Sequence, residues 1–218
     1  MAELIIKEGT CEDIVLLNEP QQVLALRQQA RSTLRIHLLH LPTKMHNLNI
    51  HDYIHIEQAG EGCKTEIYAL SCLQGNDIAG LHTQVIHSVG GGESKQVVKF
   101  ILSDQAKGDF YGELKISQDA QKTNAEQQNR NLLLSEEATM RTRPQLEIYA
   151  DDVKASHGAS TGQLDDTALF YMQQRGIPPQ KGRQLLLKAF MEDIVRTISD
   201  EDKRNASIEA VDRIVEKL

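Results

Sequence analysis

The sequence predicts a mainly β fold followed by a small helical domain, because the period of its apolar residues changes near residue 162. Before that point the apolar residues form short runs of strand length, and several alternate with polar residues, as Leu34, Ile36 and Leu38 do. No segment of this part offers the long amphipathic helix that a βαβ crossover requires. We therefore expect a β body over residues 1–162 and a helical domain over residues 163–218.

The predicted strands are short apolar runs that end at polar or glycine-containing turns. They cover residues 13–17, 33–41, 52–57, 65–72, 96–102 and 146–150. The alternation around Leu114 and Ile116 indicates one more strand. Residues 105–112 and the polar run 118–131 are interpreted as turns.

Apolar strand positions advance along the chain by a nearly constant number of residues. One series is 16, 17, 18 and 16 apart, and a second is 16, 18 and 16 apart; they consist of Leu34, Ile50, Ile67, Val85 and Ile101, and of Val98, Leu114, Leu132 and Ile148. This advance is about what one coil of a β-solenoid takes. An antiparallel sandwich also spaces its strands regularly, but it usually shows Asn-Gly or Asp-Gly hairpins, and the sequence has neither dipeptide. The spacing alone leaves both architectures open.

Three helices are predicted after residue 162. The first is capped by Asp165 or Asp166 and ends at Gly176, and Pro178 and Pro179 suit the first turn of the second. The second carries more apolar residues than one buried stripe holds, namely Leu185, Leu186, Leu187, Ala189, Phe190, Ile194 and Val195. The third is expected to start behind a Ser207 cap, with Ile208, Val211, Val215 and Leu218 on one face.

Composition and charge exclude several functional classes. The net charge is −7, and no basic cluster occurs, which argues against nucleic acid or an anionic membrane as a partner. No apolar window approaches the roughly 18 residues that a membrane span requires. The first ten residues lack the features of a secretory signal, and the three cysteines show no CxxC spacing. We expect a cytoplasmic protein without a disulfide framework.

Few residues suggest a chemical site. The sequence contains no P-loop, GxSxG, HExxH or Rossmann motif. His51 and His55 lie four residues apart, which on a strand places them on one face but too far apart to share an ion. Cys63 and Cys72 are interpreted as small buried thiols.

His157 lies between small residues in a segment interpreted as a turn at the end of the β body. A turn histidine that bonds to the local backbone is one reading. The other is a functional residue at a sheet edge, where another chain or a ligand has access. A single histidine does not make a site, so the residues alone leave both readings open.

A resemblance adds to this reading. The segment "TRPQLEIYADDVKASHGASTGQLDDTALFYMQQRGI" (142–177) resembles the signature of the SufB/SufD family of iron–sulfur cluster assembly proteins, most closely its SufD branch. Residues 110–116 and 120–154 continue the similarity, and His157-Gly158 favours the SufD branch. The resemblance implies a right-handed parallel β-helix with a C-terminal helical domain. The chain has only about half of the family's usual length, so it is expected to be a piece of a longer protein or a shortened relative.

The resemblance also implies a function. Members of this family are non-enzymatic scaffolds, in which SufD pairs with SufB and each binds one copy of the ABC-type ATPase SufC through its C-terminal helices. His157 matches the family histidine at the nascent cluster site, which is shared with the partner. We expect iron or a transient Fe–S cluster in the complex and no cofactor in the isolated chain. The expected ATPase-docking residues are Phe170, Tyr171, Arg175, Leu186 and Phe190.

Two other classes stay open. The first is a structural β-solenoid that forms a homodimer through its sheet edge. The second is a β-solenoid enzyme, such as an acyltransferase that uses a lone histidine. That enzyme class would show an aliphatic-Gly-x4 hexad, which the region before residue 160 does not supply in register.

Overall fold

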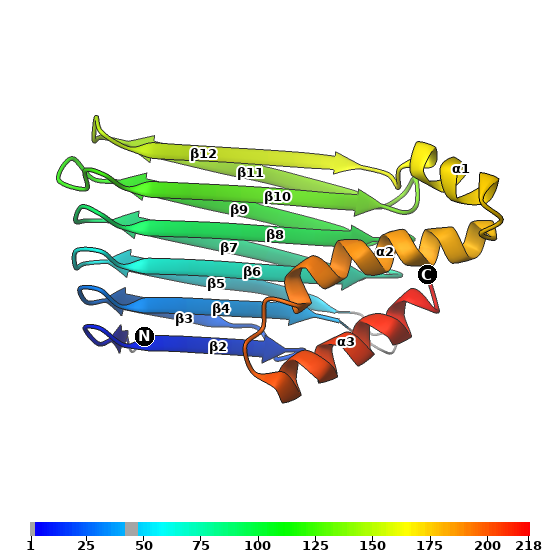
Figure 1. The fold of residues 1–218 in the computed structure, drawn as a ribbon, viewed down its shortest axis with the longest axis horizontal. Helices are drawn as coiled ribbons and strands as arrows, with labels where there is room; N and C mark the ends of the chain where they lie inside the picture. The colour runs from blue at the N-terminus through cyan, green and yellow to red at the C-terminus, as the bar shows by residue number, and fades with distance from the viewer. Residues whose placement is uncertain (1–2, 42–47) are drawn as a thin grey trace.

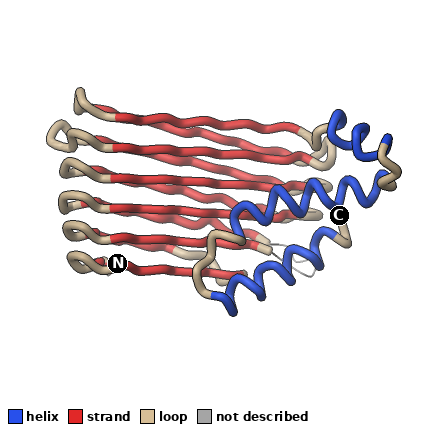
Figure 2. Tube along the Cα trace, viewed as in Figure 1, coloured by secondary structure: helices blue, strands red, loops and turns tan. Residues whose placement is uncertain are grey.

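The computed structural model describes residues 3–41 and 48–218 and shows two stacked β-sheets with helices on one side (Figures 1 and 2). Successive strands alternate between the two sheets, each of which has six strands. Sheet A contains β1 (Leu4–Ile6), β3 (Val23–Gln28), β5 (Asn49–Gln58), β7 (Ile78–His87), β9 (Lys107–Ile116) and β11 (Thr139–Ile148). Sheet B contains β2 (Cys11–Leu17), β4 (Thr33–His40), β6 (Lys64–Leu73), β8 (Glu93–Leu102), β10 (Asn124–Leu133) and β12 (Lys154–Gly162).

Neighbouring strands within each sheet are parallel, which confirms the β-solenoid over the sandwich. In sheet B, Leu34 pairs with Thr65 of the next coil, and Asn124 pairs with Lys154. A full coil is therefore about twice as long as the spacing of the apolar positions suggested. The expectation that this spacing corresponds to one coil was wrong, because it is the advance from a strand of one sheet to the next strand in the opposite sheet.

The interior between the sheets is filled by every second residue of each strand. Ile36 and Ile67 from sheet B and Val85 and Leu114 from sheet A are completely buried there. Each such aliphatic side chain contributes roughly 1.5–3 kcal/mol through burial of its apolar surface. The alternation seen in the sequence is thus the alternation between interior and outer face.

Two segments interpreted as turns are strands in the structure. Most of residues 105–112 belongs to β9, and the polar run 118–131 contributes most of β10. The run was misread because most interior positions of β10 carry polar side chains, so little apolar alternation marks the strand. Gln127, Asn129 and Asn131 are all buried.

The three helices are α1 (Asp166–Gln174), α2 (Pro179–Val195) and α3 (Glu201–Val215). The Asp165 carboxylate caps α1, and Gly176 follows it with a φ of 82°, so both predicted ends are confirmed. The predicted start of α3 was wrong. Asp200 caps this helix, whereas Ser207 lies buried inside it and donates its hydroxyl to the Lys203 carbonyl. The polar first turns of α3 hid its start, because only its second half carries the apolar stripe.

Helices α2 and α3 pack on the outer face of sheet B, toward one end of the strands (Figure 1). Apolar residues from both layers form one core, including Leu39, Leu70, Ile101, Leu187 and Ile194. Within the described residues, no helix has the length and apolar character that a membrane crossing demands.

The buried side chain of Lys99 on β8 connects sheet B to α2. The Lys99 ammonium donates to the Phe190 carbonyl at 2.7 Å and to the Asp193 carboxylate at 2.8 Å, and it lies 4.5 Å from the Phe190 ring centroid. Hydrogen bonds to charged groups of this kind are stronger than those between neutral groups. The helical segment is therefore held in a fixed position against the sheet.

The stability of the solenoid is expected to fall in mild acid because of His87. This histidine is fully buried in the interior, with Nε2 2.8 Å from the Ser94 hydroxyl, and burial lowers its pKa to about 4. The unfolded chain, with a histidine pKa of about 6.5, takes up the proton first as the pH falls. The free energy of unfolding should thus be unaffected above pH ~6.5 and drop by on the order of 3 kcal/mol by pH ~4.

Urea unfolding between pH 7 and pH 4 measures this effect. His87→Gln, which keeps a hydrogen-bonding group but does not titrate, should reduce the pH dependence of the unfolding free energy. Equal slopes for the two proteins would show that His87 is not the acid-sensitive group.

Candidate functional site

The candidate site lies on β12, the terminal strand of sheet B in the described part of the chain (Figure 1). On one side β12 pairs with β10, and its other side is a sheet edge. His157 lies within this strand and not in the turn that the sequence suggested. Parallel pairing to β10 makes the small-residue segment extended, although glycine and alanine have low strand propensity. The predicted location of His157 at a sheet edge is confirmed.

The register shows which face of β12 carries His157. His157 is aligned with Gln127, and residues aligned in parallel strands project to the same face. Gln127 is completely buried in the interior. Thr161, four residues after His157 and thus on the same face, accepts a hydrogen bond from the buried Asn131 amide at 3.1 Å. His157 therefore belongs to the interior side of the last coil, and it is exposed because this coil ends the stack.

The solenoid interior next to His157, in the preceding coil, is polar. Asn129 and Asn131 exchange amide hydrogen bonds of 3.0 and 2.7 Å, and the Thr142 hydroxyl of β11 donates to the Asn129 oxygen at 2.8 Å. Asn129 and Asn131 both lie on β10, and the Thr142 bond connects this strand of sheet B to β11 of sheet A. Sequence reasoning missed this network, because a polar run with no apolar alternation resembles a turn.

A shallow depression of about 320 Å³ lies along strands β10 and β12. It is lined by residues 126–130 and 156–160. A Cβ atom at Gly158 would meet nothing within 4 Å, so the backbone here is open to an approaching group. The edge strand thus offers an imidazole and an accessible backbone side by side.

In the part of the chain that the structure describes, His157 is not part of a cluster of metal-ligating side chains. Among the described residues no group of three or more His, Cys, Asp or Glu side chains is placed to hold a metal ion. Cys63 and Cys72 are buried, as expected, and burial raises the pKa of the Cys72 thiol to about 12. The exposed Cys11 lies on β2, at the opposite end of sheet B.

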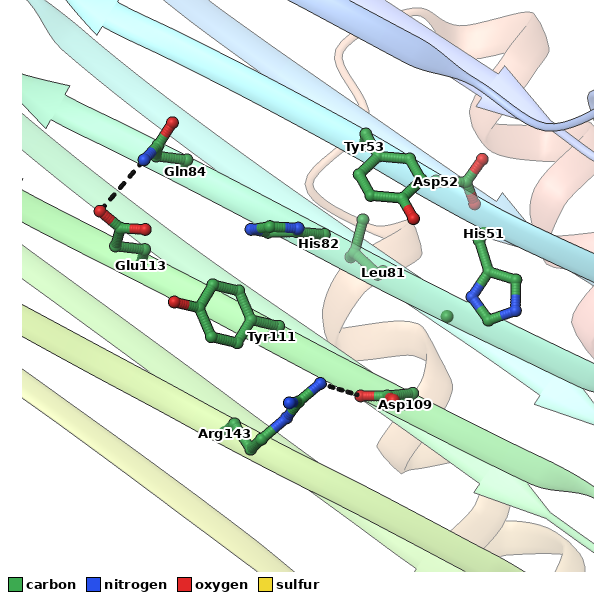
Figure 3. A pocket seen from close by; sticks show the side chains of 11 residues that line it. His51, Asp52, Tyr53, Leu81, His82, Gln84, Asp109, Tyr111, Glu113 and Arg143 are labelled. Carbon is green, nitrogen blue, oxygen red and sulfur yellow. Dashed lines mark hydrogen bonds and ion pairs between the residues drawn. The ribbon is translucent and has the colours of Figure 1, made fainter.

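A second depression, of about 370 Å³, lies on the outer face of sheet A (Figure 3). A row of rings crosses it, with the Tyr53 and His82 centroids 5.6 Å apart and the His82 and Tyr111 centroids 4.4 Å apart. The Arg143 guanidinium lies 5.4 Å from the Tyr111 centroid and forms an ion pair with Asp109. Burial lowers the pKa of His82, which favours the neutral form of this imidazole. The rings and charged groups that line this depression therefore mostly contact one another.

His51 and His55 form part of the same sheet face, as predicted. His55 Nδ1 lies 2.6 Å from the Gln84 side-chain oxygen, and the His51 ring covers Gly80, where a Cβ would overlap it. The two imidazoles have separate surroundings, and neither belongs to a cluster of metal-ligating residues within the described chain. The interpretation as a polar strand face is confirmed.

The residues expected to dock an ATPase differ in exposure. Phe170 and Tyr171 on α1 are 61% and 57% exposed, and the Arg175 guanidinium lies 4.3 Å from the Tyr171 ring centroid. Leu186 and Phe190 on α2 are half-buried. Leu185 is exposed as well, whereas Leu187, Ile194 and Val195 are buried in the core between the helices and sheet B. Some apolar residues of the helical segment therefore stay exposed, as the sequence indicated.

Comparison with known proteins identifies the family. The family model "SUF system FeS cluster assembly, SufBD core domain" matches residues 13–190. The chain is 39% identical over 142 residues to iron–sulfur cluster assembly protein SufD of Escherichia coli. The aligned segment covers 65% of this chain and 34% of that protein. It is also 37% identical over 176 residues to an iron–sulfur cluster assembly SufBD family protein of Synechocystis. That aligned segment covers 80% of this chain and 38% of the relative.

A SufD of Bacillus subtilis is 32% identical over 156 residues, 72% of this chain and 36% of that protein. The matched part thus spans about a third of the length of these curated relatives. The matched segment runs from within β2 to within α2, so it includes most of the solenoid. The chain belongs to the SufB/SufD family of iron–sulfur cluster assembly proteins, and within it the chain is most like SufD.

Proposed function

We propose that this chain is a scaffold subunit of the SUF machinery, and that it builds or accepts nascent Fe–S clusters together with a SufB-like paralogue and a SufC-like ATPase. The observation that supports this most strongly is the position of His157 on the terminal strand of sheet B. A strand of the partner added at this edge would bring its own side chains beside the imidazole.

The cluster is cargo in this proposal, and His157 supplies one of its ligands or a proton. A neutral imidazole is a good iron ligand. The remaining ligands, a thiolate and a carboxylate, come from the SufB-like partner. The chain alone is expected to bind iron weakly or not at all, and to have no enzymatic activity of its own.

The ATPase docks on the helical segment in this proposal. Phe170 and Tyr171 project from α1 with most of their surface exposed, and Leu185 on α2 is 39% exposed. Exposed aromatic residues next to an arginine are typical of interface hot spots. The odd number of cysteines and the buried thiols of Cys63 and Cys72 are consistent with a cytoplasmic complex.

Co-expression with a SufB-like paralogue and a SufC-like ATPase tests the proposal. The three proteins should elute together from size-exclusion chromatography, and the complex should assemble a cluster from iron, a sulfide source and ATP. Elution of this chain as a separate homodimer in the presence of both partners would support the structural solenoid instead.

A further inference from the structure

Arg183 on α2 differs from the other half-buried arginines of the described chain, Arg35 and Arg204. Arg35 forms an ion pair with Glu66 at 2.7 Å. Arg204 donates to the Ile198 carbonyl at 2.9 Å. Arg183 forms no hydrogen bond or ion pair with any described residue, although its Nε atom is buried. A buried charge without a partner costs stability, so a partner from another molecule is expected for this guanidinium.

Arg183 lines a cleft of about 180 Å³ at the junction of α1, α2 and the end of the solenoid. Figure 1 shows α1 beyond the ends of β10 and β12. The first turns of α2 lie against α1, because a Cβ atom at Gly182 would be 3.5 Å from the side chains of both Leu169 and Met172. Four leucines line the cleft, namely Leu133, Leu134, Leu164 and Leu169. The guanidinium thus belongs to a cleft with largely aliphatic walls.

Two carboxylates of the chain itself also line the cleft, but neither Glu136 nor Asp166 forms an ion pair with Arg183 in the described structure. Both residues are exposed, so water screens their charges. Their repulsion is stronger for a dianion such as phosphate than for a single carboxylate. The leucines also offer apolar surface to the methylene groups of an acidic side chain, which a free inorganic anion lacks. The cleft therefore suits an aspartate or glutamate side chain best.

We propose that Arg183 binds an aspartate or glutamate side chain of the SufC-like ATPase and thereby fixes where the ATPase docks on the helical segment. This inference rests on the proposed function. The cleft adjoins the exposed surface of α1, since Leu169 lines it and the next two residues, Phe170 and Tyr171, are exposed. A guanidinium binds a carboxylate through two parallel hydrogen bonds, which adds orientation to affinity. The aromatic residues supply contact area, and Arg183 selects for an acidic partner.

Isothermal titration of the purified SufC-like ATPase into variants of this chain tests the inference. Arg183→Met keeps most of the aliphatic stem and removes the charge. It should weaken binding by about 30-fold or more, as expected when one member of a buried charge pair is removed. Arg183→Lys keeps the charge without the paired donors and should lose less. The control is Arg27→Met, since Arg27 is an exposed arginine on β3 of sheet A, whereas the helices pack on sheet B. It should bind like the wild type.

A double-mutant cycle identifies the carboxylate on the ATPase. Each surface aspartate and glutamate of the ATPase is replaced in turn by its amide. One replacement should weaken binding to the wild-type chain but have little further effect on binding to Arg183→Met. Replacements that all act equally on both chains would overturn the inference.

Thermal melting shows whether Arg183 has a structural role instead. Arg183→Met should melt at or above the temperature of the wild type, because it removes an unpaired, partly buried charge. A lower melting temperature would overturn the inference, since Arg183 would then have a stabilising partner in its own chain, such as Asp166.

Equal affinity of wild type and Arg183→Met for the ATPase would also overturn the inference. If inorganic phosphate then bound to the wild type but not to Arg183→Met, the cleft would be a site for a small anion. These results would leave the proposed function intact. A wild-type chain that does not bind the ATPase at all would instead contradict the docking part of the proposed function, and this inference with it.

Discussion

His157→Ala is expected to abolish cluster formation in the complex with the SufB-like and SufC-like partners while leaving the isolated chain folded. The side chain is exposed on an edge strand, so its removal opens no cavity. The free energy of unfolding should change by less than ~0.5 kcal/mol, which is typical of exposed substitutions. Function is lost because the partner's ligands cannot complete the site without the imidazole.

Two measurements belong together here. Thermal melting reports the stability of the mutant chain, and the absorbance of the reconstituted complex reports cluster assembly. Ser156→Ala is the control, since Ser156 is the preceding residue of β12, is also exposed and faces the other side. A large loss of stability with normal cluster assembly would make His157 a structural residue.

Phe170→Asp combined with Tyr171→Asp is expected to weaken binding of the SufC-like ATPase by at least ~100-fold, which corresponds to about 2.7 kcal/mol. Aromatic hot-spot residues commonly contribute about 2 kcal/mol or more to an interface, and two adjacent charges would be desolvated in addition. Stability should hardly change, because both rings are more than half exposed in the isolated chain.

Isothermal titration of the purified ATPase into each variant measures this effect. Tyr149→Asp is the matched control, because Tyr149 is 60% exposed but lies after β11 and outside the helical segment. It should bind the ATPase with the affinity of the wild type. Equal affinity for the double mutant would move the docking surface away from α1.

The coarse architecture could be predicted because it depends on local periods. Alternation marks the strands, and Asp165 and Gly176 mark the ends of α1. The length of a coil could not be predicted this way, because Leu34 is paired with Thr65 by the stacking of coils and not by anything local. Strand β10 was hidden for a related reason. Three of its buried side chains are amides, Gln127, Asn129 and Asn131, and the last two bond to each other within the strand.

The site was predictable only in part. The sequence pointed to His157 and to a sheet edge, but it suggested a turn, because small residues form a strand here only by pairing with β10. The neighbour that gives His157 its surroundings lies a full coil earlier in the chain. No spacing within the segment reveals that Gln127 is aligned with His157 or that its amide is unbonded in the described structure.

The central claim is that His157 contributes directly to a cluster site shared with the partner. The most direct measurement uses this chain labelled with nitrogen-15 histidine and assembled with unlabelled SufB-like and SufC-like partners. After cluster formation and one-electron reduction, pulsed EPR should detect hyperfine coupling to nitrogen-15 that is absent when the chain is unlabelled. A reduced cluster that shows no nitrogen-15 coupling would contradict the claim.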